Sequence, residues 1–228
     1  MLLENSYKQL IKKALKSSTI RNDRTGVGSK SIFKSNLNWI LSNNKFPMMT
    51  GRKIYQKVFK TEFDWFINGE TNIKRFQEAG VKIWDSWADK NGDLGPVYGY
   101  QMLSYNGCNV NQLENVIDSI KNNPDSRRHI ISLWNPLQIT EMALPPCYHY
   151  FQFFVEEGGK LNMFVLQRSG DLLLGVPYDI ALFSQVLLYV SEKVDLSANI
   201  IELDIIDAHI YLNQIEAIDD YLNTETFE

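Results

Sequence analysis

Apolar residues recur along the chain with two periods, which divide it into helices and strands. Spacings of three and four residues predict helices over residues 2–17, 54–67, 111–122, 211–222 and from Pro177 to about 193. Aromatic and β-branched runs predict strands over residues 129–134, 148–156, 161–168 and 199–207. A further strand pair is expected after the polar loop at residues 22–26.

The order of these elements predicts one α+β domain over residues 1–228. Gly158-Gly159 predicts a hairpin turn between two of the strands. Residues 83–101 are rich in Gly, Asp, Asn and Trp, a composition that favours an irregular, functional segment. The sequence shows no repeat, linker or low-complexity segment that would indicate a second unit.

Charge and composition narrow the functional classes. The net charge of -4 argues against a nucleic-acid-binding surface, so any anionic ligand is expected to be small. No window approaches the roughly 18 apolar residues needed to cross a membrane. The two cysteines and an N-terminus without a signal-like apolar core favour a cytoplasmic protein.

Cys147 is the candidate nucleophile. It follows Pro145-Pro146 and directly precedes a predicted strand, and arginines near such a thiol would favour its reactive thiolate form. The alternative is a buried structural cysteine, because unpaired cysteines are commonly buried. Cys147 alone does not decide between the two.

Arginines supply candidate anion ligands. Guanidinium groups match phosphate oxygens in bidentate geometry, so several converging arginines would form a monophosphate pocket. Each one by itself is better explained as a solvated surface charge, and spacing does not show convergence. The candidates are Arg24, Arg127, Arg128 and Arg168, the last beside Ser169.

Other candidates are carboxylates, a histidine and aromatic residues. Glu62 lies one turn from Val58 and from Phe66, which places a carboxylate among apolar neighbours. The remaining candidates have structural alternatives as caps, surface groups or core residues. They are Asp171 and Asp179 flanking Gly175-Val176-Pro177, His209 and Tyr211 on one side of a strand end, and Trp84 and Trp87 as a stacking wall.

Taken in order, the motifs of the chain resemble the thymidylate synthase family from about residue 5 to residue 215. They are Asn22-Asp23-Arg24-Thr25-Gly26, Ile83-Trp84-Asp85-Ser86-Trp87, Gly92-Asp93-Leu94-Gly95-Pro96-Val97-Tyr98-Gly99, Pro124-Asp125-Ser126-Arg127-Arg128, Ala143-Leu144-Pro145-Pro146-Cys147, Gln167-Arg168-Ser169, Gly175-Val176-Pro177 and His209-Ile210-Tyr211.

The resemblance implies a large mixed β-sheet that forms the back-to-back interface of a homodimer. It implies 5,10-methylenetetrahydrofolate as the one-carbon donor, a pyrimidine nucleoside monophosphate as substrate, and no metal. Cys147 would add to carbon 6 of the pyrimidine, Glu62 would relay protons with a raised pKa, and Tyr98 would lie near the proton on carbon 5.

The resemblance also implies the binding residues. Arg127 and Arg128 would come from the other subunit, so the active sites would be shared. On the nucleotide side the resemblance implies Arg24, Arg127, Arg128, Arg168, Ser169, Gln167, Asp179, His209 and Tyr211. On the folate side it implies Trp84, Trp87, Asp171, Leu174, Gly175 and Tyr178.

Asp179 departs from the family pattern, because members that act on dUMP have asparagine at this position. An amide matches the ring N–H and carbonyl of uracil, whereas cytosine presents an acceptor and an amine donor. A protonated carboxyl group, or a carboxylate facing ring-protonated cytosine, would match cytosine. Asp179 therefore predicts dCMP as substrate, and the alternative is a tolerated variant in a dUMP enzyme.

The chain ends at Glu228, where family members continue into a C-terminal segment that closes over the folate. Without such a lid, water would compete with reduction, which favours a hydroxymethyl product and resembles the deoxycytidylate hydroxymethylases. Supply of a modified DNA precursor would suit a bacteriophage. The alternatives are thymidylate synthesis from dUMP, dCMP 5-methylation that yields dihydrofolate, and a non-catalytic nucleotide- or RNA-binding relative.

Overall fold

The computed structural model describes residues 3–22, 26–41, 47, 49 and 51–224. Its strands form one six-stranded sheet in the order β1-β2-β6-β5-β4-β3. β5 and β6 pair in parallel and the other neighbours pair antiparallel, so the sheet is mixed, as predicted. The strands are β1 (Ile20–Arg21), β2 (Ser29–Ile40), β3 (Ile130–Ser132), β4 (Tyr148–Glu156), β5 (Lys160–Asp171) and β6 (Ser197–Tyr211).

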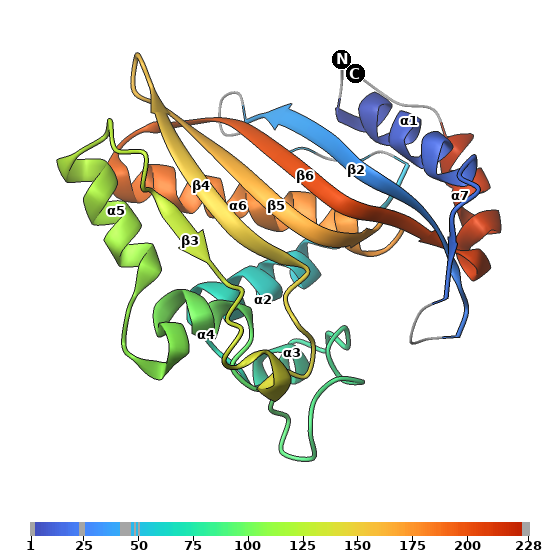
Figure 1. The fold of residues 1–228 in the computed structure, drawn as a ribbon, viewed down its shortest axis with the longest axis horizontal. Coiled ribbons are helices and arrows are strands. Elements are labelled where there is room, and N and C mark those ends of the chain that lie inside the picture. Colours follow the sequence, from blue (N-terminus) through green and yellow to red (C-terminus); the bar gives the residue numbers. More distant parts are fainter. Residues whose placement is uncertain (1–2, 23–25, 42–46, 48, 50, 225–228) are drawn as a thin grey trace.

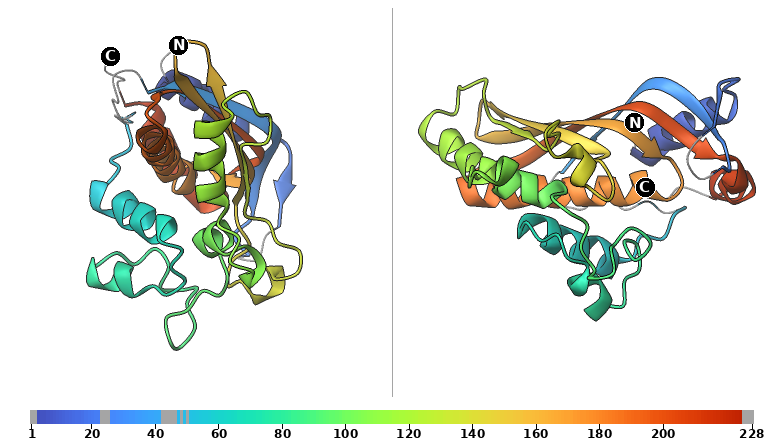
Figure 2. Two further views of the ribbon diagram at one scale, coloured as in Figure 1. Left: turned by 90° about the vertical axis from the view of Figure 1, so that its left-hand side faces the viewer. Right: turned by 60° about the horizontal axis from the view of Figure 1, so that its bottom comes forward.

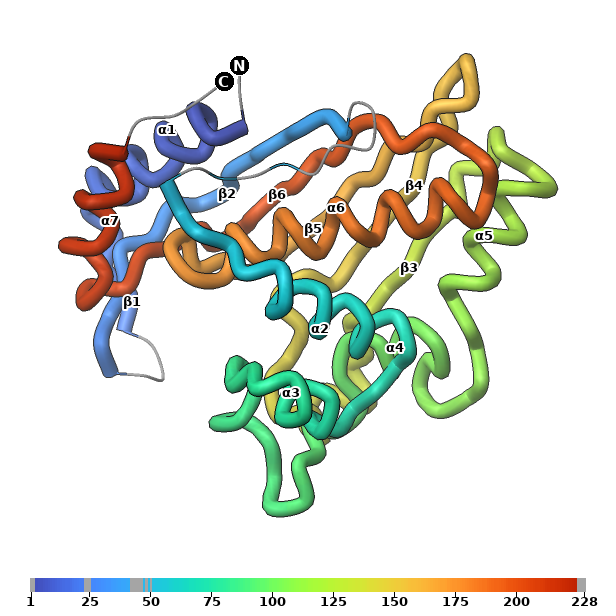
Figure 3. The backbone as a smooth tube through the Cα atoms, turned by 180° about the vertical axis from the view of Figure 1, so that it is seen from behind, coloured from blue at the N-terminus to red at the C-terminus, as the bar shows by residue number. Residues whose placement is uncertain are grey.

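Helices cover one face of this sheet. The central helix α6 crosses the back of β4, β5 and β6, and α2 lies beyond α6, so the protein has three layers (Figures 1, 2 and 3). α1 and α7 lie together at one end of the sheet, where the rings of Tyr7 and Tyr221 are 6.1 Å apart. The helices are α1 (Leu3–Leu15), α2 (Gln56–Ile67), α3 (Lys74–Glu78), α4 (Tyr98–Leu103), α5 (Gln112–Asn122), α6 (Gly175–Val194) and α7 (Ile215–Leu222).

The core lies between the sheet and α6. Alternate residues of the strands point toward the helix, so Leu37, Val165 and Leu203 are buried while their chain neighbours are more exposed. α6 is apolar around most of its circumference because it is packed on both sides, against the sheet and against α2. Such a helix is a rigid support for residues at its first turns.

The opposite face of the sheet is not crossed by a helix in the part of the chain drawn as ribbon (Figure 1). Ile40 of β2 and Phe154 of β4 lie on this face and are 61% and 64% exposed. Half-buried Phe164 and Leu166 of β5 share the face through their pairing with β4 and β6. Apolar groups of this kind on an open sheet face are typical of a surface that is covered in an assembly.

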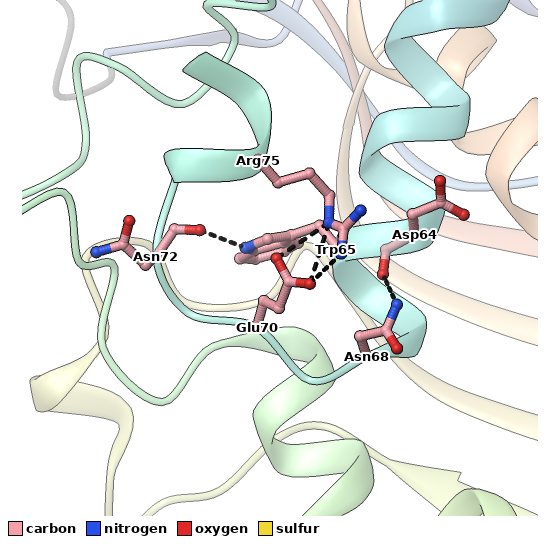
Figure 4. Close-up of polar contacts among 6 residues, drawn as sticks. All are labelled: Asp64, Trp65, Asn68, Glu70, Asn72 and Arg75. Atoms are coloured by element: carbon pink, nitrogen blue, oxygen red, sulfur yellow. Dashed lines mark hydrogen bonds and ion pairs between the residues drawn. The ribbon is translucent and has the colours of Figure 1, made fainter. Parts of the chain in front are cut away.

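The C-terminal end of α2 is tied to the segment that follows it (Figure 4). Trp65 donates its indole N–H to the backbone oxygen of Asn72 over 3.1 Å. The Asn68 amide caps the helix by donating to the Asp64 carbonyl, 2.7 Å away. Arg75 of α3 forms an ion pair with Glu70 through two of its nitrogens. These contacts fix α2, and with it the position of Glu62.

Several predicted boundaries were wrong. Residues 98–101, predicted to be irregular, begin α4, because the close approach of Gly99 to α2 is a tertiary contact that local composition does not encode. The strand pair expected after residue 26 is one long strand, β2, which pairs with β1 before it and with β6. Residues 211–214, predicted as helix, finish β6 and form a 3₁₀ turn before α7 begins at Ile215.

Three further elements are longer than predicted, and β3 is shorter. β6 covers Ser197–Tyr211 because it pairs along its length with β2 and β5, and β5 extends to Asp171. α6 begins at Gly175, two residues before Pro177, and β3 covers only Ile130–Ser132. Among the described residues, no helix has the length and apolar character that spanning a membrane requires.

Candidate active site

A cavity of about 670 Å³ opens where the carboxyl ends of β5 and β6 meet the start of β4. β5 and β6 are parallel, so they end at the same edge of the sheet, with Asp171 opposite His209. β4 runs antiparallel to β5 and begins at that edge, with Tyr148 opposite Gln167. α2, α4 and the first turns of α6 close the cavity. The topology therefore gathers residues that lie far apart in the sequence.

Most of the residues predicted from the sequence line this cavity. They are Cys147, Glu62, Tyr98, Asp179, Arg168, Ser169, Gln167, His209, Tyr211, Trp84, Trp87, Asp171, Leu174, Gly175 and Tyr178. Arg127 and Arg128 do not: both are exposed and lie outside the cavity of this subunit. Arg24 lies outside the described residues.

Several residues of the cavity wall were not predicted as site residues from the sequence, namely Arg52, Val58, Ile83, Leu144, Tyr148 and Gly170. Two of them carried a usable signal. Val58 lies one turn before Glu62 on the same helix face, and Tyr148 directly follows Cys147. Arg52 carried no signal, because it reaches the cavity only through the tertiary packing of the loop before α2.

Arg168 fixes the chain around Cys147. Its Nε donates to the Pro146 carbonyl and its Nη2 to the Pro145 carbonyl, each over 2.8 Å. The same Nη2 lies 3.8 Å from the Cys147 Sγ. Cys147 is half-buried at the cavity wall, and a guanidinium at this distance favours the thiolate over the thiol. Arginines near Cys147 were the condition that the sequence set for a reactive thiolate, and Arg168 is the arginine that the structure places beside it.

Tyr98 also contacts the backbone at Cys147. Its hydroxyl accepts a hydrogen bond from the backbone N–H of Cys147, 3.0 Å away. Tyr98 is the first residue of α4 and has a φ of 25°, a backbone conformation that L-residues rarely adopt. The next residue, Gly99, lies so close to α2 that a Cβ would be 2.2 Å from the Phe66 carbonyl oxygen. Contact between α4 and α2 therefore holds Tyr98 in place.

Glu62 lies in the middle of α2 and lines the cavity. Burial raises the pKa of its carboxyl group to about 8, and the neighbouring Asp179 carboxyl adds to the rise. The indole N–H of Trp84 opposes this rise, although it makes no well-formed hydrogen bond with a described residue. A carboxyl group with this pKa exchanges its proton near neutral pH, as a general acid or base requires.

Asp179 is held by Gln167. The Gln167 Nε2 donates to the Asp179 Oδ2 over 2.7 Å, which leaves the other carboxyl oxygen for a ligand. Burial raises the pKa of Asp179 to about 7, while the hydrogen bond from Gln167 opposes the rise and Asp171 adds to it. Asp179 is therefore protonated in a large fraction of molecules at neutral pH. The Gln167 Oε1 is buried and has no partner among the described residues.

His209 and Tyr211 lie at the end of β6 with their rings 5.2 Å apart in an edge-to-face arrangement. Burial disfavours the charged form of His209, but hydrogen bonds to the side chain and backbone of Asp207 outweigh it and raise the pKa. The His209 Nδ1 lies 3.2 Å from the Asp207 backbone oxygen, so the Nε2 edge is the part available to a ligand. The predicted placement of this pair on one side of the strand end is confirmed.

Aromatic residues form a wall of the cavity. Trp84 packs on Trp65 with ring centroids 5.8 Å apart, so it serves the core as well as the cavity, and Trp87 is more open. Tyr178 accepts a hydrogen bond from the backbone N–H of Tyr55 over 3.4 Å. Flat apolar surfaces of this kind suit a stacked heteroaromatic ring.

Asp171 has a structural task at the same wall. One of its oxygens accepts from the backbone N–H groups of Leu173 and Leu174, at 2.8 and 3.1 Å. The other oxygen accepts from the Gln214 amide at 2.9 Å. Asp171 therefore fixes the turn that leads into α6, which is the alternative that the sequence left open beside a ligand contact. Within the described residues, no group of three or more His, Cys, Asp or Glu side chains is arranged to hold a metal ion.

One comparison with known proteins bears on this site. A family model described as thymidylate synthase matches residues 5–228 of the chain. The match includes every described residue that lines the cavity.

Proposed function

The chain belongs to the thymidylate synthase family, and from this premise we propose that it transfers a one-carbon unit from 5,10-methylenetetrahydrofolate to carbon 5 of dCMP, giving 5-hydroxymethyl-dCMP and tetrahydrofolate. Members of the family are folate-dependent pyrimidine methyl- or hydroxymethyltransferases that act on pyrimidine nucleoside monophosphates. The observation that carries the choice of base is the buried Asp179, whose pKa is raised to about 7.

Cytosine presents an acceptor at ring position 3 and an amine donor at position 4. A protonated Asp179 offers an O–H to the first and a carbonyl oxygen to the second. Gln167 supports this pairing because it donates to one carboxyl oxygen and keeps the group oriented. Uracil would place its position 4 acceptor against a carboxyl oxygen, which costs on the order of 1–3 kcal/mol.

In the proposed reaction, Cys147 acts as the nucleophile toward carbon 6 of the base, which makes carbon 5 electron-rich. Arg168 keeps the thiolate oriented, and its remaining donors, with Ser169, face the nucleotide phosphate. His209 and Tyr211 bind the sugar hydroxyl, and Tyr98 lies near the proton that leaves carbon 5. These residues line one cavity, which supports their acting on one substrate.

The wall that contains Trp84, Trp87 and Tyr178 fits a folate ring system, with Leu174, Gly175 and Asp171 beside it. Bound there, the folate supplies the one-carbon unit. Glu62 then takes the proton of the water that adds to the new exocyclic carbon, a step suited to a carboxyl group with a pKa of about 8. Addition of water consumes no reductant, so the folate leaves as tetrahydrofolate. Elimination of the Cys147 thiolate from carbon 6 then restores the ring double bond and releases the nucleotide product.

We further propose a homodimer with shared active sites. The open sheet face with exposed Ile40 and Phe154 is the surface that would be covered. Arg127 and Arg128 are exposed and outside the cavity of their own subunit, so they are free to reach the phosphate bound by the partner. Arg24 is proposed for the same phosphate.

Product analysis tests the proposal. The protein is incubated with methylenetetrahydrofolate and equal amounts of dCMP and dUMP, and the nucleotides are analysed by mass spectrometry. We expect dCMP to gain one CH2O unit without formation of dihydrofolate. A gain of CH2 on dUMP, with a rise in absorbance from dihydrofolate, would instead establish thymidylate synthesis. The same gain on dCMP would establish a methyltransferase.

The control is Cys147→Ala, which keeps the cavity but removes the nucleophile. Release of tritium from carbon 5 of labelled dCMP reports the covalent step separately from the product. Wild-type protein that binds dCMP but releases no tritium would identify a non-catalytic nucleotide-binding relative.

A further inference from the structure

Tyr148 takes no part in the proposed reaction, although it lines the cavity and directly follows the proposed nucleophile Cys147. It is the first residue of β4 and is 4% exposed. Aromatic rings surround its own ring, and their centroids lie 4.7 to 6.2 Å away. These rings belong to Tyr98, Phe183, Phe151 and Phe66. A phenol packed this closely keeps one orientation.

The hydroxyl of Tyr148 makes no hydrogen bond with any residue that the structure describes. A tyrosine hydroxyl in a buried residue normally has a partner, and Tyr148 lines the cavity, so we expect that partner among the contents of the cavity. Four ionisable groups line the same cavity and influence the phenol electrostatically, namely Glu62 of α2, Tyr98 of α4, Asp179 of α6 and Cys147. Among these, Glu62 has the strongest electrostatic influence on Tyr148.

Tyr148 remains neutral throughout the working pH range. Burial raises the pKa of its phenol well above the usual value, and the charge of Glu62 adds to the rise. A neutral phenol both donates and accepts one hydrogen bond. It can therefore donate toward a carboxylate and still accept from a water molecule in the same cavity.

We infer that Tyr148 is a positioning residue for proton transfer, whose hydroxyl, through water held in the cavity, stabilises the ionised Glu62 and orients the water that Glu62 activates. The inference rests on the proposed function in giving Glu62 this task. Donation to a carboxylate favours the charged form, so Tyr148 keeps the proton affinity of Glu62 lower than burial alone would make it.

Tyr148→Phe tests the inference because it removes one oxygen and keeps the ring that the aromatic neighbours enclose. We expect kcat to fall roughly tenfold at pH 7 while the KM for dCMP stays within about threefold. Ionised Glu62 is the active form in the proposed reaction. The pH at which kcat rises should therefore shift to a value higher by roughly half a pH unit to one pH unit. Tyr189→Phe is the matched control, since Tyr189 packs its ring edge on Phe63 outside the cavity.

A second measurement does not depend on the substrate. The carboxyl carbon of Glu62 is followed by NMR during a pH titration of the ligand-free protein, with Glu62→Gln to assign the signal. The Tyr148→Phe protein should titrate at higher pH than both the wild type and Tyr189→Phe. This result would stand even if the protein proved to act on dUMP, so the inference and the proposed function can fail separately.

Two results would overturn the inference. One is a Tyr148→Phe protein with the kcat, pH profile and Glu62 titration of the wild type. The other is a Tyr148→Phe protein with a lower melting temperature, a lower kcat and a higher KM. In that protein the pH at which kcat rises and the pH at which Glu62 titrates would both equal the wild-type values. That second pattern would assign Tyr148 to packing alone.

Discussion

The hydroxyl of Tyr98 accepts a hydrogen bond from the backbone N–H of Cys147, with 3.0 Å between the two atoms. Arg168 donates to the carbonyl groups of Pro145 and Pro146, which directly precede Cys147. The peptide bond that leads into Cys147, the proposed nucleophile, is therefore held at both its N–H and its carbonyl oxygen by other elements. Precise placement of a reactive group before substrate arrives is one source of catalytic rate.

Tyr98→Phe should lower kcat by roughly one to two orders of magnitude, because it leaves the Cys147 N–H without its partner and costs about 1–3 kcal/mol of positioning energy. Iodoacetamide labelling followed by peptide mass spectrometry measures the effect on the cysteine. The rate at Cys147 should change, whereas exposed Cys108 serves as an internal reference. Equal labelling of Cys147 in the wild type and the variant would argue against the anchoring role.

Gly99→Ala should destabilise the protein by about 1–3 kcal/mol, as overpacking of a tight contact does. The added Cβ would lie 2.2 Å from the Phe66 carbonyl oxygen, so α4 must move away from α2. Denaturant unfolding compares it with Gly175→Ala, where the nearest atom would be 3.7 Å away. If both variants lost the same stability, contact between the two helices would not be the cause.

Glu62 and Tyr98 show which features of the site can be predicted from the sequence and which cannot. The stripe of Val58, Glu62 and Phe66 predicted both a helix and a carboxyl group in apolar surroundings, and the structure confirms both. Periodicity sufficed because the burial of Glu62 follows from its position on one helix. The helix that begins at Tyr98 was missed, because a positive φ and a glycine at closest approach mark a contact with α2 and not a local preference.

The convergence of the site residues in one cavity also depends on the topology of the fold, which the sequence pattern did not predict. Gln167, Asp179 and His209 were each recognisable as candidates, but nothing in their spacing placed them in one cavity. Their meeting follows from the parallel pairing of β5 with β6 and from the turn into α6. Tyr148 was overlooked as a site residue because an aromatic residue at the start of a strand is typical of a core.

Stability should fall as the pH rises from about 4.5 to about 8, since the pKa of Glu62 is raised to about 8 in the folded protein. The folded state then binds more protons than the unfolded state within this window, so the free energy of unfolding decreases by at most about 1.4 kcal/mol per pH unit for this group. Asp179 acts in the same direction up to about pH 7.

Glu62→Gln tests this linkage because the amide cannot ionise. Its melting temperature, measured from pH 5 to pH 9, should fall less steeply than that of the wild type. Above pH 8 the variant should be the more stable protein. Surface Glu114→Gln, at the first turn of α5, is the control and should follow the wild-type curve. A Glu62→Gln curve parallel to the wild type would mean that Glu62 is not protonated in the folded state.

Shared active sites would be detected by complementation. Cys147→Ala and the double variant Arg127→Ala, Arg128→Ala should each be nearly inactive. In mixed dimers, the site with an intact cysteine receives intact arginines from the partner. Activity should therefore recover on mixing to about a quarter of the wild-type value if subunits exchange freely. No recovery, despite exchange shown by mass-tagged subunits, would place the arginines in their own subunit's site or outside the reaction.

Asp179→Asn should reverse the choice of base. The amide matches uracil and leaves the acceptor of cytosine opposite a weaker partner, so kcat/KM for dCMP should fall by roughly one to two orders of magnitude while that for dUMP rises. In the wild type, the KM for dCMP should increase as the pH rises through about 7, because Asp179 loses the proton that it donates to the ring nitrogen in the proposed complex. The same increase should be absent for dUMP with the asparagine variant, whose side chain does not titrate. Competition assays with both nucleotides, run from pH 6 to pH 9, measure both effects on one preparation. An unchanged preference for dCMP in Asp179→Asn would assign base selection to Gln167 and the rest of the cavity wall.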